Sequence, residues 1–518
     1  MKPLARIPQV LLLAFLVAPV LAAAAVDEAP WPRSTPEEQG VDSRALASFL
    51  ERVQSQDRDL HSLLVLRHGH LILECYVHPY DAGTLHNVKS VSKSVLGALA
   101  GIGLEEGDLP ELHAPVAELL PGLLGDGADP RKRQITLRHL LTMTSGLDLD
   151  ENGPITEEIF SSQDWVAATW ERPVVAQPGS VFVYSTALTH TFSAVLTHQT
   201  GQTASEYAAA HLFGPLGITD YQWVLGPQGH SFGGAELFMR PRDMARFGML
   251  YLNGGRSMGR QIVPAEWVAA STRNQIGTIP AEARYGYWWW LYRDEHPVAT
   301  GANGQMVGVS PAQDLVVVMT AADPELPEMF GRSMANYPLS EEPLKPRPRQ
   351  QELLQLFVDQ LEDPDPLDTQ MPPGLAMEIS GVAYALDPNP LGIERITLRF
   401  ANAPADTAEV ELVGPYGHER FPVGLDGRYR VTAVGEVDET GEVGETAGAA
   451  EAGVMPTGNR VALRGHWISG RTFQLNYMEM GDPSVTQTHL TFQRDGLLMR
   501  VKIRPAGFTH ELRGRPVD

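Results

Sequence analysis

The chain has 518 residues, more than one ordinary hydrophobic core accommodates, so we expect two folded domains. Hydrophobic residues make up 43% of the chain and charged residues 20%, an ordinary balance for a soluble globular protein. The formal net charge of -23 argues against nucleic acid or an anionic membrane surface as a partner.

The first 25 residues have the pattern of a secretory signal peptide. Lys2 and Arg6 provide a positive start, residues 10–21 form an apolar core, and alanines at 22–25 offer small residues for cleavage. The apolar run is short for a membrane anchor. We therefore expect a periplasmic or secreted protein with no integral membrane segment after cleavage. Cys75 is the only cysteine, so no intramolecular disulfide bond is possible.

Two apolar runs, residues 63–67 and 71–76, flank a His-Gly-His turn and predict a β-hairpin. The next stretch, residues 86–99, reads HNVKSVSKSVLGAL and predicts a helix that is buried after Lys93. Ser90 and Lys93 are three residues apart, so a helix places both side chains on one face.

Ser90 and Lys93 have the residue types of a nucleophile and its base. A serine hydroxyl becomes a useful nucleophile when a neighbouring base accepts its proton. A lysine can serve as that base when burial lowers its pKa from about 10.4. The start of the helix also offers free N–H groups to a developing oxyanion. On the tetrapeptide alone, a capped helix with a solvated lysine is the favoured interpretation, and the rest of the chain must change it.

Further along the chain, several segments could line a cleft. Tyr184 stands between an extended run and a helix predicted over residues 187–201, either in a core or at a cleft edge. The aromatic run at residues 285–290, YGYWWW, either packs a core or forms the wall of an acyl pocket. Residues 299–305, ATGANGQ, join two strands and have small side chains where a ligand could approach the backbone.

The last third of the chain changes character. A helix is predicted over residues 349–361, followed by a proline-rich, acidic stretch that we interpret as a linker. From residue 379 onward, short runs of alternating apolar residues with glycine-rich turns predict a small β-barrel or β-sandwich. Within it, residues 435–453 are rich in Gly, Ala and Glu and are predicted to form a disordered loop.

Taken together, residues 34–361 resemble the serine β-lactamase and penicillin-recognising superfamily. The resemblance rests on Ser90-Val91-Ser92-Lys93, Tyr184-Ser185-Thr186 and Ala299-Thr300-Gly301, in that order and spacing. It is strongest with the class C-like branch that includes esterases and 6-aminohexanoate-dimer hydrolases. The resemblance implies an α/β (α+β) fold, with an antiparallel sheet flanked by helices and an all-α subregion.

This resemblance sets the expected domain boundaries. We expect a signal peptide at 1–25, a β-lactamase-like serine hydrolase domain at 26–361, a linker at 362–374 and a C-terminal β domain at 375–518. No metal or organic cofactor is implied.

The resemblance also assigns roles to individual residues. Ser90 would form the acyl-enzyme, and Lys93 would either take its proton or hold Tyr184 as a tyrosinate. The backbone N–H groups of Ser90 and Ala302 would form the oxyanion hole. Substrate would contact Thr186, Thr300, Gly301 and Trp288.

Two departures from the family pattern affect the expected substrate. Thr186 replaces an asparagine that helps hold the substrate amide, and Ala299 replaces a lysine or histidine that faces a substrate carboxylate. We therefore expect a small ester or amide as substrate, rather than efficient β-lactam hydrolysis. Two alternatives remain: a D-aminopeptidase or D-alanyl carboxypeptidase acting on peptidoglycan fragments, and a non-catalytic binding protein that retains the fold.

Overall fold

The computed structural model describes residues 31–151, 153–277, 284–292, 296–369, 371–414, 417–434, 460–505 and 507–517. The predicted signal peptide and the predicted loop at 435–453 lie outside these residues.

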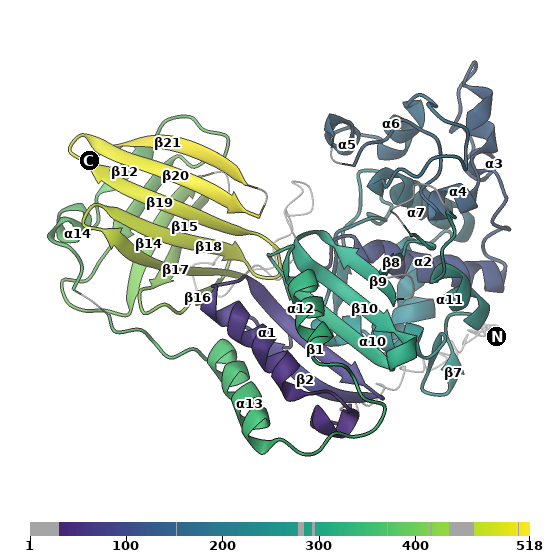
Figure 1. The fold of residues 1–518 in the computed structure, drawn as a ribbon. Helices are drawn as coiled ribbons and strands as arrows, with labels where there is room; N and C mark the ends of the chain where they lie inside the picture. The colour runs from purple at the N-terminus through teal and green to yellow at the C-terminus, as the bar shows by residue number, and fades with distance from the viewer. Residues whose placement is uncertain are drawn as a thin grey trace, which may run out of the picture. The chain divides into compact units, whose positions relative to one another are not determined.

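An antiparallel six-stranded sheet forms the centre of the region before residue 362 (Figure 1). Its strands follow the order β2-β1-β11-β10-β9-β8. The bounds are His70–Tyr76 for β2, Leu60–Arg67 for β1, Leu315–Ala321 for β11, Gln305–Ser310 for β10, His296–Gly301 for β9 and Trp290–Tyr292 for β8. The first two strands are the hairpin predicted from sequence, and Cys75 is buried in β2.

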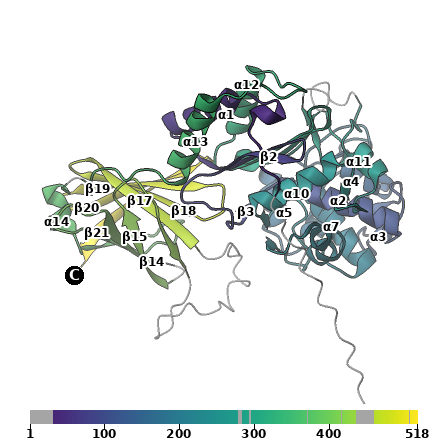
Figure 2. The ribbon, with the colours of Figure 1, turned by 90° about the horizontal axis from the view of Figure 1, so that it is seen from below.

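Helices cover both faces of this sheet, because the buried strands alternate between two apolar clusters. Leu63, Val65 and Val317 belong to a cluster that includes residues of α1 (Ser43–Ser55), α12 (Leu326–Ala335) and α13 (Pro348–Glu362). Leu64 and Val316 face the opposite way, toward α2 (Val91–Glu106) and α10 (Pro241–Leu252). Figure 2 shows α1, α12 and α13 on one side of the sheet, and α2 and α10 on the other.

A mainly helical subregion lies beside α2 and completes the β-lactamase-like fold. Its helices are α3 (Val116–Leu119), α4 (Leu137–Leu141), α5 (Pro154–Phe160), α6 (Trp165–Glu171), α7 (Thr186–Thr200), α8 (Ala204–Ala208), α9 (Gly214–Leu216) and α11 (Ala265–Ser271). Short strands β3 (His86–Asn87), β5 (Leu237–Met239) and β4 (Tyr221–Trp223) form a small sheet, and β6 (Arg256–Ser257) pairs with β7 (Arg260–Gln261).

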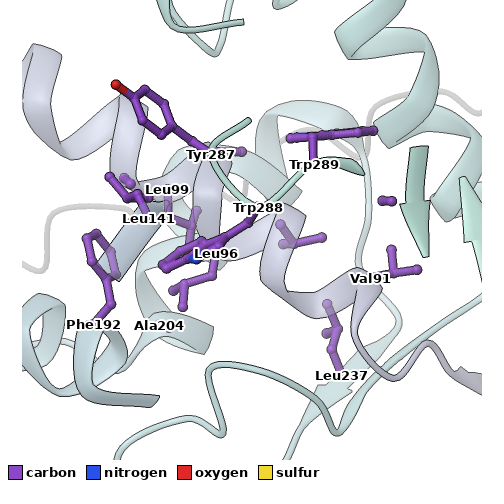
Figure 3. Close-up of a cluster of buried hydrophobic side chains, with 14 of the residues drawn as sticks. Val91, Leu96, Leu99, Leu141, Phe192, Ala204, Leu237, Tyr287, Trp288 and Trp289 are labelled. Carbon is purple, nitrogen blue, oxygen red and sulfur yellow. The ribbon is translucent and has the colours of Figure 1, made fainter. Parts of the chain in front are cut away.

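The core around α2 is densely aromatic and fixes that helix from several sides (Figure 3). Gly101 packs directly against the Trp267 indole, since a Cβ at Gly101 would lie 2.2 Å from that ring. Trp267 Nε1 donates to Gly97 O at 2.8 Å. Ser94 Oγ donates to Trp288 O at 2.6 Å. These contacts immobilise the helix that begins after Ser90.

The C-terminal region is a β-barrel in which nine strands close into a ring, which decides between the two architectures predicted for it. A tenth strand, β16, pairs with β17 beside this ring. Closure occurs where β15 pairs with β17 at Gly424 and Arg464. Val410, Leu463, Phe473 and Leu490 are completely buried in its apolar cluster, so side chains fill the interior. The elements are α14 (Gly374–Ile379), β12 (Ala383–Leu386), β13 (Arg395–Arg399), β14 (Thr407–Gly414), β15 (Gly417–Gly424), β16 (Arg430–Ala433), β17 (Arg460–Ser469), β18 (Thr472–Glu479), β19 (Val485–Gln493), β20 (Gly496–Arg504) and β21 (Phe508–Val517).

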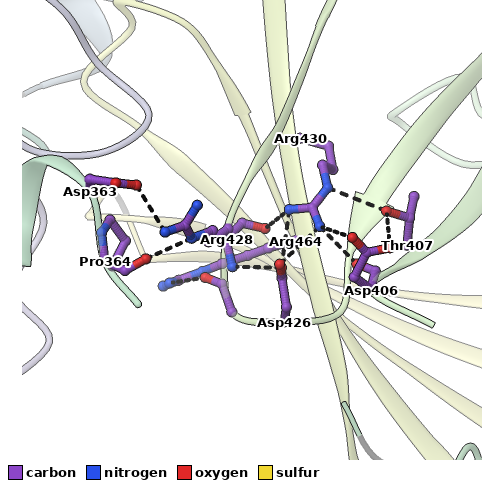
Figure 4. A network of polar contacts seen from close by, with 9 residues as sticks. Asp363, Pro364, Asp406, Thr407, Asp426, Arg428, Arg430 and Arg464 are labelled. Atoms are coloured by element: carbon purple, nitrogen blue, oxygen red, sulfur yellow. Dashed lines mark hydrogen bonds and ion pairs between the residues drawn. The ribbon is translucent and has the colours of Figure 1, made fainter. Parts of the chain in front are cut away.

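Polar contacts bind the segment after α13 to the barrel (Figure 4). Arg428 donates to Pro364 O at 2.6 Å and pairs with Asp363 at 2.8 Å. Asp426 O accepts from Leu367 N at 2.8 Å, and its carboxylate is held by Arg430 at 3.0 Å. The stretch predicted as a linker is therefore attached to the barrel between residues 363 and 367.

Candidate active site

Ser90 occupies the N-cap position of α2, but its hydroxyl makes no capping hydrogen bond. Lys89 precedes it with φ of 48°, a left-handed conformation that costs a non-glycine residue about 1–2 kcal/mol. Such strain often accumulates where a fold fixes a side chain for function. The Ser90 hydroxyl is directed to Lys93, whose Nζ lies 2.9 Å from Ser90 Oγ.

Lys93 is 1% exposed and has three oxygen atoms around its amine. Nζ lies 2.9 Å from Ser90 Oγ, 2.8 Å from Thr186 Oγ1 and 2.8 Å from Gly234 O. Burial lowers the pKa of Lys93 from 10.5 to about 8, against the opposing attraction of the Glu151 carboxylate. The neutral amine is therefore accessible near physiological pH.

The three partners determine where the lone pair of a neutral Lys93 points. Gly234 O can only accept a hydrogen bond, so it takes one N–H of the amine. The Thr186 hydroxyl donates to Glu151, so Thr186 Oγ1 accepts a second N–H. The remaining direction faces Ser90 Oγ. A neutral Lys93 can thus accept the Ser90 proton, which is the requirement for a general base.

Tyr184 joins the same group. The centroid of its ring lies 4.9 Å from Lys93 Nζ, and the Ser90 side chain acts on the pKa of its phenol. Burial raises the pKa of Tyr184, with the Glu151 charge adding to the effect and the Ser90 hydrogen bond opposing it. The buried environment thus favours the neutral phenol, which can donate and relay a proton.

The end of β9 lies against the turn that precedes Ser90. A Cβ on Gly301 would lie 2.3 Å from Val88 O and 3.1 Å from Lys89 Cβ, so only glycine allows this approach. Thr300 and Gly301 are the last residues of β9, and Ala302 follows directly. The structure thus brings the segment predicted to complete the oxyanion hole next to the segment that bears Ser90. Ala299, in contrast, is buried among apolar residues.

Two predicted substrate contacts have other surroundings. Trp288 is 1% exposed, packs edge-on against Phe192 and donates to Leu140 O at 3.1 Å. Trp288 therefore packs as a core residue. Thr186 is also buried, and its hydroxyl lies between Lys93 and Glu151 instead of facing a ligand.

Trp290 takes the position that we expected for Trp288. This half-buried ring stacks on Tyr184 at 5.4 Å between centroids, and it meets Tyr285 at 4.8 Å. Phe182 lies 5.2 Å from Tyr285 and 6.0 Å from Trp290. Together these four residues, Phe182, Tyr184, Tyr285 and Trp290, form an aromatic wall that begins at the candidate catalytic phenol.

Glu151 and Gly234 are the site residues that sequence reasoning missed. Glu151 accepts hydrogen bonds from the backbone N–H of Thr186, at 2.7 Å, and from its hydroxyl. A Cβ on Gly234 would lie 3.1 Å from Lys93 Nζ, so glycine allows its carbonyl to reach the amine. Two features of the sequence could have indicated these residues: an acidic run at residues 148–151, and the Gly233-Gly234 pair in a segment without an evident turn.

Two other kinds of feature, a metal-binding cluster and a membrane-spanning helix, are absent from the described residues. No group of three or more His, Cys, Asp and Glu side chains in those residues is arranged to hold a metal ion. None of their helices combines the length and the apolar character needed to span a bilayer.

Comparison with known proteins places the fold and the site in one family. The Beta-lactamase family model matches residues 47–335, more than half of the chain, and the protein belongs to this family. The match includes every residue of the candidate site described above. The expected α/β fold of this superfamily is confirmed.

Relatives of the chain include a hydrolase and an esterase. The chain is 25% identical over 322 residues to 6-aminohexanoate-dimer hydrolase of Paenarthrobacter ureafaciens, which covers 56% of this chain and 80% of that protein. It is 30% identical over 213 residues to esterase EstB of Burkholderia gladioli, covering 36% of this chain and 53% of that esterase. A solved structure from Bacillus anthracis, named after a proposed 6-aminohexanoate-dimer hydrolase activity, superimposes with a TM-score of 0.51 at 20% identity. It covers 60% of this chain and 87% of its own, which shows the shared fold. The protein is thus a β-lactamase-fold hydrolase related to esterases and amidases.

Proposed function

We propose that this protein is an exported serine hydrolase that cleaves esters or amides through an acyl-enzyme on Ser90. The observation that carries the proposal is the convergence of three groups. Ser90 Oγ lies 2.9 Å from the amine of buried Lys93, and the same amine lies 4.9 Å from the centroid of the Tyr184 ring. Export is supported by the sequence pattern of residues 1–25.

The reaction has two halves. Ser90 Oγ attacks the carbonyl carbon while its proton passes to neutral Lys93, and the carbonyl oxygen becomes an oxyanion facing the N–H groups of Ser90 and Ala302. The bond to the leaving group then breaks, and the leaving oxygen or nitrogen takes a proton relayed through Tyr184. Water attacks the resulting ester at Ser90, and its proton passes through the Tyr184 phenol to neutral Lys93. The bond to Ser90 Oγ then breaks, Lys93 returns the proton to this oxygen, and the carboxylic acid leaves.

Charge and shape favour an uncharged, partly apolar substrate. Ala299 is buried and apolar where a cation would bind a substrate carboxylate, and Glu151 adds negative charge near Lys93 and Tyr184. The aromatic wall of Phe182, Tyr184, Tyr285 and Trp290 suits an alkyl or aryl group. Penicillins and D-alanyl peptides carry a carboxylate, so we propose that both are poor substrates.

A substrate panel with a matched pair of variants tests the proposal. The purified full-length protein is assayed with p-nitrophenyl butyrate, nitrocefin and a D-alanine p-nitroanilide. Ester turnover should dominate and should disappear in Ser90→Ala. Ser92→Ala is the control, since Ser92 Oγ donates to Lys89 O at 2.6 Å in the same helix turn and faces away from Lys93. Nitrocefin turnover without ester turnover would contradict the substrate assignment, and Ser90→Ala with full activity would contradict the mechanism.

A further inference from the structure

Half-buried Glu151 and buried Thr186 form a polar pair against the Lys93 amine. Glu151 follows the loop after α4, and Thr186 is the first residue of α7. One carboxylate oxygen accepts the Thr186 N–H at 2.7 Å, and the other accepts the Thr186 hydroxyl proton. The start of a 15-residue helix stabilises negative charge, so the carboxylate is well matched to this location.

We propose that Glu151 and Thr186 are a positioning pair that keeps Thr186 Oγ1 an acceptor for Lys93 and so directs the Lys93 lone pair at Ser90. This inference rests on the proposed function. Neither residue touches the reacting atoms; both act through Lys93. The pair also replaces the asparagine of the family pattern, since it supplies the acceptor for lysine without an amide N–H that could bind a substrate carbonyl.

The argument depends on the direction of one hydroxyl proton. A threonine hydroxyl has one proton and can rotate to donate to whichever acceptor is nearest. A carboxylate only accepts, so Glu151 holds that proton and leaves a lone pair of Thr186 Oγ1 facing Lys93 Nζ at 2.8 Å. Without Glu151, the hydroxyl could turn its proton toward the neutral amine and occupy the lone pair that Ser90 needs.

Glu151 also acts on Lys93 through its charge. Its attraction raises the pKa of Lys93, in opposition to the larger effect of burial. The other groups around the amine are the Ser90 and Thr186 hydroxyls, the Gly234 carbonyl and the Tyr184 ring. Glu236, two residues beyond Gly234, is bound by Lys89 at 3.3 Å and by Asn87 at 2.7 Å. Removal of the Glu151 charge should therefore make Lys93 easier to deprotonate while it is less well oriented.

Two readouts separate positioning from a structural role. In Glu151→Gln, kcat for p-nitrophenyl butyrate at pH 9 should fall about 10–100-fold, the range of an impaired general base, with KM changed less than threefold. The acidic limb of the pH–rate profile should move to lower pH. Thr186→Val should lose a similar factor, whereas Thr186→Ser should keep activity within threefold of wild type. The double variant Glu151→Gln/Thr186→Val should be about as slow as the slower single variant, because the two residues act as a unit.

Glu206 and Thr203 provide the matched control. They form the same kind of contact at the start of another helix, α8, where the Glu206 carboxylate accepts from Thr203 N at 2.7 Å and from its hydroxyl at 3.0 Å on the protein surface. Glu206→Gln should change neither kcat nor the pH profile. If Glu151→Gln behaves like Glu206→Gln, or if the Glu151 and Thr186 effects multiply in the double variant, the positioning pair is refuted.

A titration without turnover distinguishes this inference from the proposed function. Lysine residues labelled with 13C at Cε report the titration of Lys93 by NMR, with Lys93→Met assigning the signal. Glu151→Gln should shift the Lys93 midpoint to lower pH whether or not an ester is hydrolysed. An unchanged midpoint would refute the inference even in an active enzyme, while the expected shift in a protein without Ser90-dependent turnover would refute only the proposed function.

Discussion

Lys93→Met should separate the contributions of Lys93 to stability and to activity. Burial lowers the pKa of Lys93 from 10.5 to about 8, so the folded state disfavours the ammonium that the unfolded chain accepts freely. Integrated over pH, this difference in pKa lowers the free energy of unfolding by about 3 kcal/mol at pH 7 and by less than about 1 kcal/mol at pH 10. Each pKa unit corresponds to about 1.36 kcal/mol. Methionine fills a similar volume without a charge.

The sign of the pH dependence follows from the direction of this shift. Below pH 8 the lysine is charged in both states and the fold bears the full cost, whereas above pH 10.5 it is neutral in both states and the cost vanishes. Lys93→Met also leaves Gly234 O and the Thr186 hydroxyl without their partner, at about 1 kcal/mol each, but that loss does not vary with pH in this range.

The assay is urea denaturation of wild type and Lys93→Met at pH 7 and pH 10, with ester turnover measured in parallel. The stability of the variant relative to wild type should be roughly 2–3 kcal/mol more favourable at pH 7 than at pH 10, and its turnover should be lost. Equal relative stabilities at the two pH values would refute the reasoning, because they would mean that Lys93 titrates alike in the folded and unfolded states.

Five further substitutions, in three experiments, test separate parts of the site. Tyr184→Phe removes the proton relay and should lower kcat about 10²–10⁴-fold, with stability by denaturation nearly unchanged; full activity would remove the phenol from the mechanism. Gly234→Ala puts a methyl group 3.1 Å from Lys93 Nζ and 2.5 Å from Thr186 Cγ2, and it should lower kcat at least about tenfold. Gly331→Ala in α12 places its methyl group in open space and should leave kcat unchanged. Equal effects of the two substitutions would contradict the packing argument. Trp288→Ala should lower the free energy of unfolding by about 3–5 kcal/mol, because it leaves a cavity in the core. Trp290→Ala should mainly raise KM for aryl esters. The reverse pattern would mean that Trp288, not Trp290, lines the site.

The sequence was most informative where local pattern and chemistry coincide. The Ser90–Lys93 spacing predicted a shared helix face, and the apolar residues after Lys93 predicted its burial; the structure has both. The hairpin at β1 and β2 was equally clear, because strongly apolar strands with a glycine turn have few alternatives. Most barrel strands were visible as alternating runs.

Two barrel strands, β15 and β21, lack that alternation. β15 contains Pro422 and charged residues, and β21 has Leu512 as its one fully buried large apolar side chain among polar neighbours. Such strands are held by their partners in the ladder and not by their own pattern, since β21 pairs on both sides with β12 and β20.

Within the site, long-range geometry decided what local pattern could not. Trp288 and Trp290 are both part of one aromatic run, and only their packing shows that the first fills the core and the second stacks on Tyr184. Glu151 is 35 residues from Thr186 in the chain, so no local spacing predicts that its carboxylate caps the start of α7. Likewise, the effect of burial on the pKa of Tyr184 depends on neighbours from distant segments.

The most direct test of the central claim is to trap the covalent intermediate. The full-length protein is mixed with p-nitrophenyl butyrate, quenched in acid within its first turnovers, digested and examined by mass spectrometry. A butyryl group on the peptide that contains Ser90, absent from Ser90→Ala, is the predicted result. Ester hydrolysis with no adduct on that serine, or with an adduct on another residue, would contradict an acyl-enzyme at Ser90.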